Sequence, residues 1–177
     1  MAVPLLLDLS LMLLVVCAAV NDLLSRRIPN LLLMAGMLGA FALHLLSAAP
    51  VNSVVAGLGG IVTGLLLFLP LYCVRGMAAG DVKLLATVGA FSTPGEVLQI
   101  AVWSVCAGGV MALAAVLAKG KLRTVGVNLR CLLRPLLMRL IGLPAVVEPL
   151  PQASVGTIPY GLAIACGTLF IIAKRAV

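Results

Sequence analysis

The chain has 177 residues, of which 63% are hydrophobic and 10% charged, and its mean hydropathy is +1.27. Several uncharged stretches reach the roughly 20 residues that a helix needs to cross a hydrocarbon core of about 30 Å. This composition predicts an all-α, polytopic membrane protein. It leaves no room for a separate soluble domain, so we expect residues 1–177 to form a single domain.

The charge balance is strongly basic, with 12 lysines and arginines against five acidic residues. On a membrane protein such a surplus indicates cytoplasmic loops and contact with anionic lipid rather than nucleic acid. Aromatic residues, at 4%, provide no stacking surface for bases either. The five cysteines show no CxxC spacing, so we expect no metal and no cofactor, and we interpret the cysteines as small buried hydrophobic residues.

The first half of the chain predicts three membrane helices. The first covers residues 3–21 and ends at Asn21 and Asp22, before two arginines, and Pro29 suits the first position of the next helix. No Asp, Glu, Lys or Arg occurs from residue 28 to residue 74, which is long enough for two spans, with the turn at residues 47–53. His44, near an outer helix end, is interpreted as an interfacial residue.

The second half predicts three more. A fourth apolar segment, residues 84–95, has only 12 residues and is short for a span, whereas residues 97–118 and 155–173 are long enough. Between them, residues 121–141 combine leucines at helical spacing with basic residues and no acid, which is typical of an amphipathic helix on an anionic membrane surface. We therefore expect about six transmembrane helices and one basic interfacial helix.

Orientation follows from the positive-inside rule. If the connections after the first, third and fifth helices face the cytoplasm, ten of the 12 cations lie there and only Lys174 and Arg175 lie outside. Both chain ends are then expected outside. Asp22 and Asp81 fall at the cytoplasmic ends of their helices.

These two aspartates are the candidates for chemistry. Asp8 lies near the opposite end of the first helix, and Glu96 and Glu148 fall in connections. Two neighbouring carboxylates cannot easily both ionise, so the pair holds one proton and can act on a water as base and on a carbonyl oxygen as acid. This chemistry is that of an aspartic protease, which uses no metal.

Each aspartate also has a simpler interpretation. Asp81 follows Gly80 and precedes an apolar helical run, as a helix N-cap does, and Asp22 is close in sequence to Arg26 and Arg27, which suit a surface ion pair. Gly80 permits a tight turn, and Lys83 can position a carboxylate or a substrate. The residues alone leave catalysis and these structural roles open.

Two longer motifs resemble a known family. NDLLSRRIPN, residues 21–30, and GMAAGDVKLLATVGA, residues 76–90, resemble the two signatures of the prepilin peptidases, membrane aspartic proteases with a GxGD motif. SVGTIPYGLAIACGT, residues 154–168, is similar to the later PYG segment of that family. The resemblance implies that Asp22 and Asp81 are the catalytic pair. The residues in supporting or substrate-positioning roles would be Gly80, Lys83, Arg27, Asn30 and Tyr160. Tyr160 either hydrogen-bonds a catalytic carboxylate or anchors the chain at the interface.

The chain departs from the family pattern at two points. Ala78 replaces the first glycine of GxGD, and only residues 23–28 separate the first two helices, without the CxxC insertion of the larger, methylating members. It resembles the small peptidase-only branch associated with Flp or Tad pili. The resemblance implies an enzyme of the bacterial inner membrane that removes the short basic leader of Flp-type prepilins or pseudopilins at the cytoplasmic face, without methyltransferase activity.

Several glycines of the apolar helices are candidates for contact with a substrate helix. Small residues allow close helix approach in lipid, so several glycines either contact the substrate helix or serve internal packing. These glycines are Gly57, Gly59, Gly60, Gly64, Gly108 and Gly109. The alternatives to a peptidase are a small channel or transporter component that relays protons through the two aspartates, and a non-catalytic pilus-assembly protein. The sequence identifies neither the particular pilin nor the oligomeric state.

Overall fold

The computed structural model describes residues 2–120, 122–124, 126–127, 130–131, 134, 138 and 159–176. In this part the chain forms α-helices and no strand, which confirms the all-α prediction. The helices are α1 (Ala2–Ser25), α2 (Asn30–Leu45), α3 (Pro50–Cys73), α4 (Ala79–Ala90), α5 (Pro94–Ala118) and α7 (Tyr160–Ala176). Contacts divide the chain into one unit of residues 1–108 and 159–177 and a second of residues 109–158.

Three of these helices are long and apolar enough to cross a membrane, namely α1 from Val3, α3 and α5. Helix α2 is apolar but has 16 residues, α4 has 12 and α7 has 17. A 12-residue helix rises only about 18 Å. The membrane-protein prediction therefore holds for three spans, and the number six remains a prediction.

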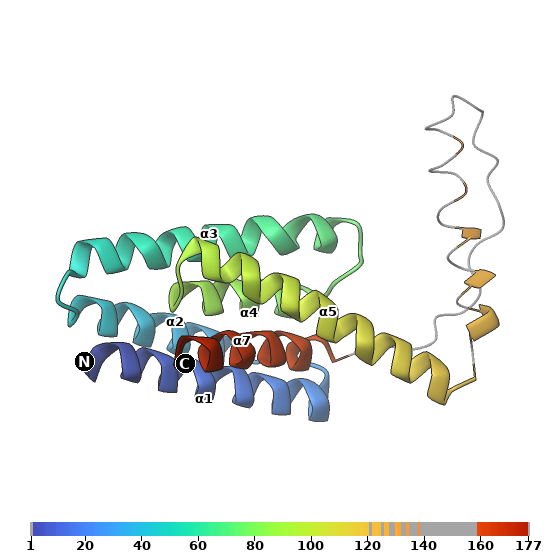
Figure 1. Ribbon diagram of the computed structural model, residues 1–177, viewed down its shortest axis with the longest axis horizontal. Coiled ribbons are helices and arrows are strands. Elements are labelled where there is room, and N and C mark those ends of the chain that lie inside the picture. The colour runs from blue at the N-terminus through green and yellow to red at the C-terminus, as the bar shows by residue number, and fades with distance from the viewer. Residues whose placement is uncertain are drawn as a thin grey trace. The chain divides into compact units, whose positions relative to one another are not determined.

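Helix α4 forms the centre of the first unit. It contacts α1, α2, α3 and α7, and every residue from Leu84 to Ala90 is buried. Helices α1 and α7 pack side by side, with the two chain ends at the same end of the bundle (Figure 1). The C-terminal turn of α1 and the first turns of α4 and α7 consequently lie together at the opposite end.

Glycines bring α3 and α4 into backbone contact. A Cβ atom at Gly60 would overlap the carbonyl oxygens of Gly89 and Ser92, and one at Gly64 would lie 2.8 Å from the carbonyl oxygen of Leu85. Such close approach between helices requires residues without a side chain. Of the two roles expected for these glycines, internal packing is the one that the structure shows for Gly60 and Gly64.

Two arginines follow the C-termini of α1 and α3, at the end of the bundle where α4 begins. Arg26 and Arg75 follow α1 and α3 with φ of 54° and 58°, in the left-handed conformation that commonly ends a helix. A positive charge at this point is favourable because it faces the negative end of the helix dipole. In the second unit, Gly120 follows α5 in the same left-handed conformation, with φ of 64°.

Several sequence interpretations need correction or lie outside the described residues. His44 is buried rather than interfacial, and its Nε2 donates a 2.8 Å hydrogen bond to the carbonyl oxygen of Ala90 at the end of α4. Interpreting the cysteines as buried was wrong, because Cys73, Cys106 and Cys166 are exposed and face the surroundings of the bundle. Most of the predicted interfacial helix at residues 121–141, and Glu148, lie outside the described residues.

Candidate active site

Asp22 lies in the last turn of α1, which continues to Ser25 instead of ending at residue 21 as expected. Its residue is only 7% exposed. One carboxylate oxygen, Oδ2, accepts a 2.8 Å hydrogen bond from the backbone N–H of Gly161 in the first turn of α7. Asp22 is therefore a buried carboxylate held between two helices.

Asp81 lies in the first turn of α4 and is also 7% exposed. Burial raises the pKa of this carboxyl from 3.8 to about 6, the charge of Asp22 adds to the rise, and the backbone N–H of Ala78 partly offsets it. Ala78, not Asp81, is the N-cap residue of α4, because the helix begins at Ala79. Asp81 is therefore the third residue of the helix and not its N-cap. From this position its carboxyl group interacts with the backbone N–H of the N-cap residue, Ala78.

The two carboxyl groups form one electrostatic unit. They come from α1 and α4, 59 positions apart in sequence, and the charge of Asp22 acts on the ionisation of Asp81. Interacting carboxylates titrate as a pair, and the form with one proton contains both a base and an acid. The arrangement can therefore activate a water and protonate a carbonyl oxygen at the same place.

The expected supporting residues divide into near and distant ones. Lys83 is exposed, and its Nζ donates a 3.1 Å hydrogen bond to Oδ1 of Asn30, which links α4 to the start of α2. The side chain of Arg27 is exposed. In the described residues, Lys83 has an amide oxygen as its hydrogen-bond partner and not an aspartate carboxylate.

Tyr160 lies closer to the acidic pair. The residue is partly buried, and its ring packs edge-on against Phe68, with ring centres 5.9 Å apart. A Cβ atom at Gly108 would lie 2.8 Å from the ring, so this glycine provides the space for the tyrosine. Tyr160 is within electrostatic range of Asp81, at the helix start that binds Asp22. Its position favours a role beside the carboxylates over a purely interfacial one.

The backbone at the start of α4 shows why Ala78 is accommodated there. Ala78 has φ −80° and ψ 150°, an extended conformation that any L-residue adopts. Gly80 lies inside α4 without a positive φ, and a Cβ atom there would make ordinary contact, at 3.7 Å, with the side chain of Ile28. Neither position requires glycine for the backbone conformation of α4.

Two contributions to the structure were missed from the sequence. The N–H of Gly161 is a backbone group, so no side-chain motif announces it. Glu96 was placed in a connection, but its Oε2 accepts hydrogen bonds of 2.8 and 2.9 Å from the N–H and hydroxyl of Thr93, the first of which is one half of a capping box at the start of α5. The spacing TPGE at residues 93–96 carries that signal in the sequence.

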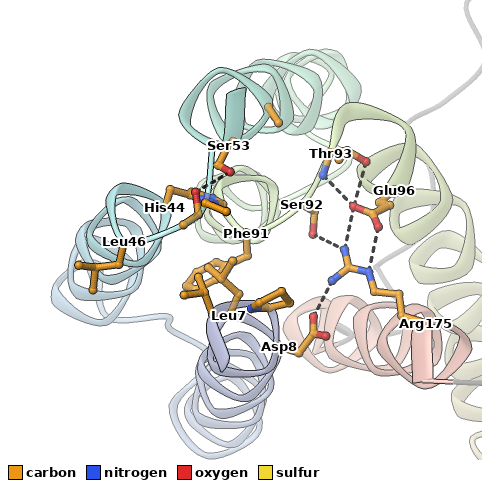
Figure 2. Close-up of a pocket in the computed structure, with 16 residues that line it drawn as sticks. Leu7, Asp8, His44, Leu46, Ser53, Phe91, Ser92, Thr93, Glu96 and Arg175 are labelled. Carbon is orange, nitrogen blue, oxygen red and sulfur yellow. Dashed lines mark hydrogen bonds and ion pairs between the residues drawn. The ribbon is translucent and has the colours of Figure 1, made fainter. Parts of the chain in front are cut away.

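A second polar cluster lies at the opposite end of the bundle (Figure 2). Arg175 forms a salt bridge of 2.6 Å with Asp8 and one of 2.8 Å with Glu96, and it donates a 3.3 Å hydrogen bond to Ser92. These groups border a cavity of about 920 Å³ that does not include Asp22 or Asp81. The cluster joins α1, α5 and α7, and we interpret it as structural.

Replacing Arg175 with methionine is expected to lower the free energy of unfolding by about 1 to 3 kcal/mol, because it leaves the half-buried carboxylates of Asp8 and Glu96 facing each other. Thermal unfolding in detergent, followed by the fluorescence of Trp103, measures this. Lys174→Met removes an adjacent, exposed cation and serves as the matched control. Equal unfolding temperatures for the two variants would contradict the structural role.

Residues 9–113 match the model of the type IV leader peptidase family. This match includes Asp22 and Asp81 and ends before α7. No curated protein and no solved structure gives a significant match.

Proposed function

Because the chain belongs to the type IV leader peptidase family, we propose that it is an aspartic endopeptidase that cleaves the short basic leader from Flp-type prepilins or pseudopilins. Asp22 and Asp81 are its catalytic pair in this proposal. The observation that supports it best is the pair itself, two buried carboxyl groups from separate helices whose charges interact. Family membership already indicates a peptidase, and the pair supplies the aspartic chemistry.

The reaction requires one water and one shared proton. One carboxylate takes a proton from the water as its oxygen attacks the carbonyl carbon, while the other carboxyl group gives its proton to the carbonyl oxygen. The resulting diol collapses when its hydroxyl proton returns to the second carboxylate. The first carboxyl group protonates the leaving nitrogen, the C–N bond breaks, and the starting proton arrangement is restored.

The proposed location is the bacterial inner membrane, with the pair toward the cytoplasm. Arg26 and Arg75 end α1 and α3 at the level of the pair, which agrees with a cytoplasmic end near anionic lipid. The connection from α1 to α2 contains only residues 26–29. With no room for an insertion at this point, we propose a peptidase without methyltransferase activity.

The structure gives less support to the proton-channel alternative. Beyond Lys83, the buried part of α4 is apolar except for Thr87, whose hydroxyl donates a 2.9 Å hydrogen bond to the carbonyl oxygen of Lys83. A proton pathway along this helix would need further polar groups. The pair is better suited to chemistry at one end of the bundle.

Co-expression with a Flp-type prepilin tests the proposal. We expect a gel shift that corresponds to loss of the leader, and mass spectrometry of the product should give an unmethylated N-terminus at the junction between the leader and the hydrophobic helix. Omission of the peptidase is the control. Failure to cleave any of several Flp-type prepilins, with the peptidase present and folded in the membrane, would contradict the proposed substrate class.

A further inference from the structure

Helix α7 supplies a hydrogen-bond donor to the acidic pair from outside the segment that matches the family. The match ends at residue 113, whereas Gly161 is the second residue of α7. The backbone N–H of Gly161 is one of the first-turn donors that have no acceptor within their own helix. Here this donor bonds Oδ2 of Asp22 over 2.8 Å in a buried setting. The first turn of α7 is thus part of the site.

This hydrogen bond decides which oxygen of Asp22 is free. The terminal torsion of a carboxylate has a broad minimum, so an unrestrained carboxylate can present either oxygen to a reactant. When Oδ2 is held by the N–H of Gly161, the oxygen that remains is Oδ1. Among the described residues no donor is bonded to Oδ1, so this oxygen can accept a hydrogen bond from a water. The effect is one of orientation and is the same whichever carboxyl group carries the proton.

We propose that Gly161 is a positioning residue, whose backbone N–H holds the Asp22 carboxylate so that Oδ1 is the oxygen that meets the reacting water. This inference rests on the proposed function and adds to it a residue beyond the family match. General acid–base catalysis requires groups within hydrogen-bond reach and aligned, and a displacement of about 1 Å can cost about 100-fold in rate. A backbone donor suits this role because it has no rotamer to change.

Glycine at position 161 is required for the contact. A Cβ atom there would lie 2.9 Å from Oδ2, 3.1 Å from Cβ and 3.2 Å from Cγ of Asp22. Contacts this short would push the carboxylate away or separate α7 from α1. The lack of a side chain therefore lets the N–H of Gly161 reach the carboxylate directly.

A second glycine keeps α7 from moving aside. A Cβ atom at Gly167 would lie 2.6 Å from Oγ of Ser104 and 2.8 Å from the carbonyl oxygen of Ile100, both on α5. Between the two glycines, Ala163 and Ile164 are fully buried. Helix α7 therefore packs closely against both α1 and α5, and this packing fixes the position of its first turn.

Replacing the backbone amide at position 161 by an ester tests the inference without adding an atom. Glycolic acid, incorporated there by nonsense suppression, exchanges the N–H for an oxygen. We expect kcat for prepilin cleavage to fall about 10- to 100-fold, because the carboxylate loses its donor. KM should stay within about threefold, because orientation of the carboxylate matters in the transition state and not in substrate binding. The assay uses the full-length enzyme in detergent and a purified Flp-type prepilin.

Gly161→Ala tests the same contact by displacing the carboxylate instead of removing the donor. We expect a loss of kcat of at least about tenfold, again with KM nearly unchanged. The unfolding temperature is measured in parallel, and cleavage is expressed per folded molecule. A role in helix packing alone would lower the unfolding temperature and leave kcat per folded molecule unchanged.

Gly95 provides the matched control. It is also the second residue of its helix, α5, and it lies beside Glu96 at the opposite end of the bundle. No atom stands within 4 Å of a Cβ atom placed there. The ester at position 95 and Gly95→Ala should both keep kcat and KM within about threefold of the wild type.

The outcomes separate the inference from the proposed function. An unchanged kcat in the folded ester variant at position 161, or equal losses at positions 161 and 95, overturns the role of Gly161. A raised KM with unchanged kcat also overturns it, because Gly161 would then act in substrate binding. If Asp22→Asn cleaves prepilin normally, the proposed function itself fails. If Asp22→Asn is inactive and the ester variant is normal, only the role of Gly161 fails.

Discussion

Replacement of either Asp22 or Asp81 by asparagine is expected to reduce prepilin cleavage by about 100- to 10,000-fold. Asparagine has nearly the same shape as aspartate, so the helices can pack as before, but it can neither accept the proton from water nor return one. Cleavage rates in detergent, measured at equal amounts of folded enzyme, give the size of the loss. Either variant keeping more than about a tenth of the activity would contradict general acid–base catalysis by the pair.

The matched control is Asp8→Asn, which removes a carboxylate of the same helix as Asp22 but at the opposite end of the bundle. We expect it to lower stability through the loss of its salt bridge with Arg175, while cleavage per folded molecule stays within about threefold of the wild type. If Asp8→Asn lost as much activity as Asp22→Asn, the loss would not be specific to the catalytic pair, and the control would contradict the assigned role of Asp22.

Stability provides a second control, because the Asp81 variant should be more stable than the wild type at neutral pH. The pKa of Asp81 is about 6 in the folded protein against 3.8 for the free side chain, so the folded state binds the proton more tightly. Stability therefore falls as the pH rises from about 4 to 6, and ionised Asp81 remains a cost above that range. Asp81→Asn removes this cost, which is on the order of 1 to 3 kcal/mol. Thermal unfolding should show the gain at pH 7.5 and its disappearance near pH 4.

Replacement of Gly60 by alanine is expected to leave most of the protein molecules unfolded. The added methyl group would overlap the carbonyl oxygens of Gly89 and Ser92, which are backbone atoms and cannot rotate away. Separating α3 from α4 would open the core around α4, at a cost of about 3 kcal/mol or more. The amount of monodisperse protein on size-exclusion chromatography, together with the unfolding temperature, measures the effect.

Gly39→Ala is the control for this change, because Gly39 also lies within a helix but no atom stands within 4 Å of a Cβ placed there. By helix propensity alone, alanine should stabilise at this position by up to about 1 kcal/mol. Normal accumulation and unfolding of Gly60→Ala would show that α3 and α4 do not approach as closely as described.

The sequence predicted most of the helical segments because charges and turn residues mark their ends. It also selected Asp22 and Asp81, since the positive-inside rule put them at one level and the motif resemblance singled them out. The boundaries were less accurate. Helix α4 begins at Ala79 rather than Leu84, because the helix includes the polar residues that a hydropathy pattern cuts off.

Contacts between residues far apart in the sequence could not be predicted from local charge, turn or motif patterns. Arg175 and Asp8 are 167 positions apart, and nothing in either local sequence names the other. Likewise, His44 was interpreted as interfacial because it lies near an outer helix end, but its hydrogen-bond partner, the carbonyl oxygen of Ala90, belongs to α4. The amide of Gly161 escaped notice for a different reason, since it belongs to the backbone and every residue except proline has one.

The burial of α4 has a consequence for how the enzyme responds to its bilayer. Lipid thickness acts on helices that touch acyl chains, through tilting and stretching of their apolar length. Helix α4 is enclosed by protein from Leu84 to Ala90, so the apolar length of this helix does not have to equal the thickness of the hydrocarbon core. The depth of Asp81 is thus set by the glycine contacts with α3, and hydrophobic mismatch reaches it only through the longer helices that surround it.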